Sequence, residues 1–254
     1  TGQFGKFIRY RNEPWYIQKQ KRAEAAAETF GFRKVSDLKL AVAQRLKQYV
    51  SQGGFLFSMC SGTETFDIAL AAHQTDVVPK AYDGDPVDPN ALQQLDFDNT
   101  LAFRDFTPNL NAREYSHSNI DVGPPPSEMR DPSLDYFTLF EFSAKWDPVP
   151  TMLTQNHVAT VKGFVGQTTA YSEDVLKEDV VVLAEAPDRP QVRYIHGTHG
   201  KGTFTFYSGH DPEDSQLFVG DPPTDLSLHP NSPGYRLILN NILFPAAKKK
   251  KRKT

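Results

Sequence analysis

The one cysteine of the chain stands where a strand would pass into a helix. Cys60 ends the apolar run of GGFLFSMC, and the small residues Ser61 and Gly62 open the amphipathic stretch that follows. A side chain at such a turn lies beside the first N–H groups of a helix, which lower the pKa of a thiol and can hold an oxyanion. The spacing therefore predicts a nucleophilic Cys60 with oxyanion contacts from the backbone near Ser61 and Gly62. The alternative is a small, buried apolar residue at a turn.

A cysteine nucleophile needs a base, and His210 is placed to supply one. It follows the predicted strand 203–207 in the stretch GTFTFYSGHDPED, with Asp211 and Glu213 close behind it. A histidine at the end of a strand, with a carboxylate that orients its ring, completes a Cys-His-acid arrangement. The competing interpretation is a turn rich in Gly, Asp and Pro.

Two other groups of residues are candidates for holding a metal ion. Asp83, Asp85 and Asp88 are close together in DGDPVDPN, as oxygen ligands of Ca²⁺ would be, but the spacing of an EF-hand is absent and a solvated turn is favoured. His196 and His199 flank a Gly-Thr pair, yet no carboxylate stands at the spacing of a metalloprotease. We therefore expect no metal and no cofactor.

Helices and strands alternate in the predicted pattern. Helices are expected over 14–32, 36–53, 64–72 and 233–244, and strands over 55–59, 136–143, 159–164, 180–184, 192–195 and 203–207. The polar segment at about 76–132 is interpreted as an irregular insertion with short strands such as 101–105. Because a buried run like 55–59 is typical of parallel sheets, we expect an α/β three-layer sandwich with a mainly parallel central sheet. Its N-terminal strands are expected to be missing from the chain, apart from a weak candidate at 7–10.

The composition favours one domain with an acidic body. A chain of 254 residues that is 39% hydrophobic can bury its own core, and we assign that domain to 1–247. Removing the six positive charges of the basic tail, 248–254, from the net charge of −3 leaves the body at −9. Such a body repels phosphate backbones, so we expect no nucleic-acid partner; binding of an anionic surface by the tail is the alternative to a solvated tail. The oligomeric state stays open.

The location of the protein is also left open by the sequence. No apolar run is long enough to span a membrane, and we expect no membrane span. The chain begins at Thr1 without a methionine, so both a cytoplasmic protein and an exported one with a removed signal peptide are compatible with it.

Two stretches resemble motifs of a known family. Cys60 within GGFLFSMCSG and His210 within FYSGHDPED are similar to the two signatures of the class I glutamine amidotransferase-like fold, and GKGTFTFYSGHDPE resembles the closing strand of its ThuA-like branch. Over the whole chain, including DYFTLFEFSAKWDPVPTMLTQNH, the sequence is similar to bacterial proteins labelled asparagine synthetase B.

The resemblance implies a cysteine-dependent amidohydrolase or amidotransferase that acts on a small molecule with an amide or acyl group. Cys60 would be its nucleophile and His210 its proton shuttle. Asp211 is inserted relative to the His-Pro-Glu motif of the family, so Asp211 and Glu213 are both candidates for orienting the ring. The ThuA-like branch generally lacks the cysteine, and it implies instead a non-catalytic module that binds a small molecule or a carbohydrate.

Overall fold

The computed structural model describes residues 10–114, 116–123, 135–140, 158–164, 166, 168–186, 189–213 and 222–243. The helices of this part are α2 (Pro14–Thr29), α3 (Val35–Ser51), α4 (Ser61–Ala71), α5 (Lys80–Asp83) and α6 (Pro233–Leu243). Its strands are β1 (Phe55–Met59), β2 (Tyr136–Leu139), β3 (Thr160–Lys162), β4 (Tyr171–Ser172), β5 (Val181–Glu185), β6 (Gln191–His199) and β7 (Gly202–Tyr207). Short 3₁₀ helices lie at Ala91–Gln94, Phe97–Asn99, Glu173–Val175 and Leu226–Leu228. The basic tail and most of the strand candidate at 7–10 fall outside the described residues.

Several of the predicted elements are confirmed, with ends shifted by a few residues. The helices expected around 14–32, 36–53, 64–72 and 233–244 correspond to α2, α3, α4 and α6, and the predicted strand 55–59 is β1. The helix α3 ends at a Gly-Gly pair, where Gly53 has a φ of 111° that other residues rarely adopt. Local signals of this kind are sufficient to place an element without knowledge of its neighbours.

The short strand expected at 101–105 is absent. Phe103 forms only an isolated bridge with Leu176. The carboxylate of Asp67, on α4, accepts hydrogen bonds from the backbone N–H groups of residues 101, 102 and 103 at 2.7–2.9 Å. Because these N–H groups bind a side chain, they do not form a ladder with another strand.

The sheet contradicts the expected mainly parallel sandwich. The described strands form one curled, half-barrel-like sheet in the order β1-β7-β6-β5-β2-β3, with β4 paired to β6. Only β1 and β7 run parallel, whereas the other neighbours are antiparallel. Parallel neighbours need a long crossover between them, usually a helix. The described chain between β2 and β7 contains no α-helix, so its strands pair with reversed direction.

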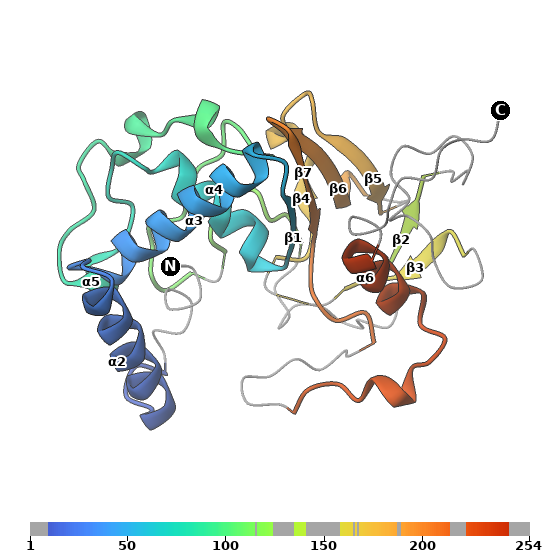
Figure 1. The fold of residues 1–254 in the computed structure, drawn as a ribbon, viewed down its shortest axis with the longest axis horizontal. Helices are drawn as coiled ribbons and strands as arrows, with labels where there is room; N and C mark the ends of the chain where they lie inside the picture. The colour runs from blue at the N-terminus through green and yellow to red at the C-terminus, as the bar shows by residue number, and fades with distance from the viewer. Residues whose placement is uncertain are drawn as a thin grey trace.

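The sheet separates two hydrophobic clusters, because alternate residues of a strand face opposite sides. On one side Phe206 of β7 packs with Leu70 of α4 and with the segment 101–106. On the other side Tyr207 packs with Leu237 of α6. Figure 1 shows α3 and α4 beside β1 at one end of the sheet, and α6 next to β3. Burial of each such side chain contributes about 1.5–3 kcal/mol, so both faces stabilise the sheet.

Among the described helices, none combines the length and the apolar character that crossing a bilayer requires.

Candidate functional site

Cys60 forms a sharp turn between β1 and α4. Its φ of 55° and ψ of −145° lie in a region that residues other than glycine rarely occupy. Three hydrogen bonds hold the turn: Cys60 N donates to the carbonyl oxygen of Tyr207 at 3.0 Å, and the N–H and Oγ1 of Thr63 both donate to the carbonyl oxygen of Cys60, at 3.1 and 2.8 Å. The strand, the strained residue and the helix together have the form of a nucleophile elbow.

The parallel pairing of β1 with β7 brings the region of His210 to the same edge of the sheet. Met59 is paired with Tyr207, so the residues that follow the two strands leave the sheet side by side. Gly166 lies between them: a Cβ atom placed on it would be 2.9 Å from Cys60 Sγ and 2.8 Å from Gly209 Cα. His210, the next residue, is exposed. Cys60 itself is buried, with 9% of its surface accessible.

Ser61 and Gly62, the predicted oxyanion contacts, are the first two residues of α4. Backbone N–H groups in the first turn of a helix have no carbonyl partner within that helix, and they form its positive end. Ser61 is buried, and a Cβ atom on Gly62 would meet Ser58 Oγ at 3.0 Å, so the turn packs closely against this side chain of β1.

Asp211 and Glu213 contact α6 and the segment before it. Asp211 Oδ1 accepts hydrogen bonds from Tyr235 Oη at 2.7 Å and from Glu213 N at 3.0 Å, and its Oδ2 accepts one from Thr224 Oγ1 at 2.5 Å. Burial, together with the hydrogen bond to Asp211, raises the pKa of Tyr235. Glu213 Oε2 lies 3.8 Å from His229 Nδ1. The two acids therefore connect the turn after β7 to the C-terminal helix.

Buried polar side chains surround the base of the elbow, and the sequence reasoning did not single them out. Glu64, one turn beyond Cys60, is fully buried and binds Ser118 Oγ at 2.6 Å and Thr168 Oγ1 at 2.8 Å. Tyr171 Oη donates to Thr63 Oγ1 at 3.1 Å, and burial raises the pKa of this tyrosine. The helical spacing of the sequence does indicate that Glu64 is buried, because it shares a helix face with the apolar residues four and seven positions later.

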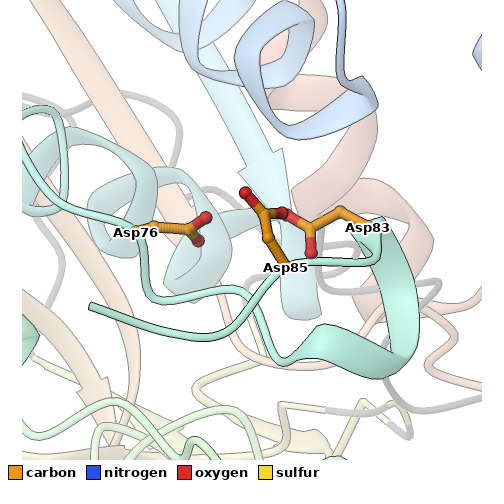
Figure 2. Close-up of side chains that lie close together, drawn as sticks. All are labelled: Asp76, Asp83 and Asp85. Atoms are coloured by element: carbon orange, nitrogen blue, oxygen red, sulfur yellow. The ribbon is translucent and has the colours of Figure 1, made fainter. Parts of the chain in front are cut away.

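Three aspartates meet at the start of α3, as Figure 2 shows, and a lysine binds all of them. Lys34 Nζ lies 3.1 Å from Asp76 Oδ2, 3.5 Å from Asp83 Oδ2 and 2.5 Å from Asp85 Oδ2. These contacts raise the pKa of Lys34, above all through the hydrogen bond to Asp85, and burial raises the pKa of Asp83. Two of the suggested Ca²⁺ ligands, Asp83 and Asp85, therefore bind the ammonium group of Lys34. The third, Asp88, accepts a hydrogen bond from Asp76 N at 2.7 Å.

Among the described residues, these three aspartates are the only group of His, Cys, Asp or Glu with ligand atoms close enough for one metal ion. His196 and His199, the other candidates for metal ligands, do not belong to such a group. His196 Nδ1 lies 2.9 Å from Thr205 Oγ1, on the neighbouring strand.

Two cavities in the described part of the chain lie away from the elbow. One of about 350 Å³ is lined by the beginning of α3 and by the end of α4, including Lys34, His73 and Asp76. Another of about 80 Å³ lies between α2, α3 and α5, against Tyr16 and Tyr82. Neither is lined by Cys60 or by His210.

Comparison of the chain with family models, with curated proteins and with solved structures gave no match, so its strained Cys60 turn and the polar side chains beneath it are the evidence from which its function has to be inferred.

Proposed function

We propose that the chain is a cysteine-dependent hydrolase or acyl-transfer enzyme that acts at the C–N bond of a small amide, with Cys60 as the nucleophile. The backbone of Cys60 carries this proposal. A non-glycine residue at φ 55° and ψ −145°, between a strand and a helix, is a strained conformation of the kind that functional sites retain. The resemblance of the stretches around Cys60 and His210 to amidotransferase motifs supports it.

In the proposed reaction the Cys60 thiolate attacks the amide carbonyl, while backbone N–H groups at Ser61 and Gly62 hold the oxyanion. The C–N bond then breaks as His210 gives a proton to the leaving amine, and a thioester remains on the sulfur. A water molecule gives a proton to His210, attacks the thioester and releases the carboxylic acid. If an amine attacks in place of water, the acyl group is transferred to that amine. Asp211 or Glu213 is the proposed acid that orients the imidazole.

Alkylation of the thiol tests the proposal. We expect iodoacetamide to modify Cys60 of the wild type faster at pH 7 than Cys60 of His210→Ala, because in the proposed pair the imidazolium of His210 stabilises a thiolate. The same preparations are then assayed for ammonia release from primary amides, beginning with glutamine and asparagine, with Cys60→Ala as the blank. An alkylation rate that His210→Ala leaves unchanged would rule out the proposed pair.

The enclosure of the sulfur supports a second candidate function, a non-catalytic module that binds a small molecule or a carbohydrate. Cys60 is 9% exposed, and Gly166 packs against its Sγ. For a module of this kind, the thiol of the folded protein should resist iodoacetamide throughout the pH range, and it should react only after unfolding in urea. The alkylation experiment therefore separates the two candidates.

A further inference from the structure

Glu64 holds two distant segments of the chain against the helix that begins after Cys60. Its side chain is fully buried, in the first turn of α4. Oε1 accepts a hydrogen bond from Ser118 Oγ at 2.6 Å, and Oε2 accepts one from Thr168 Oγ1 at 2.8 Å. Burial of a carboxylate is unfavourable unless donors compensate it, so the hydroxyl groups and the carboxylate fix one another in place.

Thr168 connects this carboxylate to the residue before His210. The carbonyl oxygen of Thr168 accepts a hydrogen bond from Gly209 N at 2.5 Å. Two residues earlier in the chain, Gly166 occupies the space between Cys60 Sγ and Gly209 Cα. Gly166 therefore packs against both the elbow and the turn that carries His210, and the hydrogen bond that Thr168 donates to Glu64 holds Thr168 on the side of α4.

We infer that Glu64 is a positioning residue for the pair of Cys60 and His210, and that it acts through Thr168. The inference rests on the proposed function, because it concerns the geometry of that pair. Without the carboxylate, Thr168 loses its contact with α4, and Gly209 is free to move with it. Proton transfer between a thiol and an imidazole depends steeply on their separation, so a small shift is enough to lower the reactivity of the sulfur.

A matched control lies on the same helix. Asp67 is also a fully buried carboxylate of α4, but its oxygens accept hydrogen bonds from backbone N–H groups of residues 101–103. Those residues pack in the hydrophobic cluster on the α4 side of the sheet. A substitution of Asp67 therefore measures how the loss of a buried carboxylate on α4 changes stability, separately from any effect on the geometry of Cys60 and His210.

The test is the rate of Cys60 alkylation by iodoacetamide as a function of pH, measured by mass spectrometry on the full chain. Glu64→Ala and Thr168→Val should each lower the rate at pH 7 by about tenfold and raise the pH midpoint. Glu64→Gln retains an acceptor oxygen, Thr168→Ser retains the hydroxyl, and both should stay within about threefold of the wild type. Asp67→Asn should lower the midpoint of urea unfolding but leave the pH midpoint of alkylation unchanged.

A double-mutant cycle shows whether Glu64 acts through His210. If it does, Glu64→Ala combined with His210→Ala should react no more slowly than His210→Ala alone. Additive losses, or an effect of Asp67→Asn equal to that of Glu64→Ala, would overturn the inference while leaving the proposed function intact. A wild-type thiol that shows no dependence on His210 would instead refute the proposed function itself.

Discussion

Cys60 keeps a backbone conformation that ordinarily belongs to glycine. A φ of 55° brings Cβ close to the carbonyl group of the preceding residue, and strain of this kind costs on the order of 1–3 kcal/mol. The parallel pairing of β1 with β7 and the hydrogen bonds from Thr63 stabilise it. A residue with a Cβ atom at this position therefore lowers the free energy of unfolding.

Replacement of Cys60 by glycine or by alanine measures that strain. Both substitutions remove the sulfur, but only glycine removes the Cβ atom, so we expect Cys60→Gly to be more stable than Cys60→Ala by about 1 kcal/mol. Urea unfolding of the two variants at pH 7 gives the difference. An alanine variant that is as stable as the glycine variant would show that the turn carries no strain.

Gly166 is a second residue at which a single methyl group has a large effect. A Cβ atom there would lie 2.9 Å from Cys60 Sγ and 2.8 Å from Gly209 Cα, and backbone atoms cannot yield as a flexible side chain does. We expect Gly166→Ala to lower the free energy of unfolding by about 1–3 kcal/mol and to slow alkylation of Cys60. Unchanged urea unfolding would contradict this account of the packing between the elbow and Gly209.

At this scale Cys60 and His210 could be proposed from the sequence, because a lone cysteine after an apolar run and a histidine after a strand are visible locally; their roles stay a prediction. Glu64 and Gly166 could not be found in the same way. An acid in the first turn of a helix ordinarily faces solvent, and the partners of Glu64 are Ser118 and Thr168, which only the folded chain brings near it.

At the scale of elements, a half-buried carboxylate joins the segment before residue 123 to the segment at 168–171. Asp121 Oδ1 accepts hydrogen bonds from Gly123 N, Thr169 N and Ala170 N at 3.0–3.2 Å. Burial, which outweighs these hydrogen bonds, raises the pKa of Asp121 to about 6. The folded protein therefore holds this proton at a pH at which the unfolded chain has released it.

This difference makes stability depend on pH. Because the folded pKa is the higher one, the contribution of Asp121 to stability is present below about pH 4 and is lost as the pH rises through about 6. Asp121→Asn keeps the acceptor oxygen without the charge. We expect its free energy of unfolding to exceed that of the wild type by about 2 kcal/mol at pH 7 and to equal it at pH 4. Urea unfolding across this range gives both curves, and parallel curves would contradict the prediction.

Lys34 joins α3 to the segment 76–85 through three carboxylates. We expect Lys34→Met to lower the free energy of unfolding at pH 7 by about 1–3 kcal/mol, because Asp76, Asp83 and Asp85 then repel one another. The loss should shrink toward pH 4, since burial raises the pKa of Asp83 and its carboxyl takes up a proton early.

Added calcium tests whether the instability of Lys34→Met comes from repulsion between the three carboxylates or from the lost packing of the lysine side chain. Millimolar CaCl₂ should raise the melting temperature of Lys34→Met, whose carboxylates lack their cation, and should leave the wild type unchanged. Stabilisation of both proteins to the same degree would mean that calcium acts elsewhere.

At the scale of the whole molecule, the sequence predicted the direction of pairing only for the first strand. The apolar run at Phe55–Met59 does run parallel to a neighbour, as such runs commonly do. Between β2 and β7 the described parts of the connections contain no α-helix, and a short turn such as the one between β6 and β7 can only reverse the chain. The positions of strands are local properties, whereas their partners depend on the connections between them.

The pairing of Met59 with Tyr207 joins parts of the chain that are far apart in sequence. A nascent polypeptide that has not yet produced β7 lacks Gly209 and the residue after it, and Cys60 there is an ordinary thiol. The sulfur acquires these neighbours only after the chain has been synthesised past Gly209 and β7 has paired with β1. Under the proposed function, the reactive thiol therefore exists only once β1 and β7 have paired, and the rate of its alkylation during refolding would report that pairing.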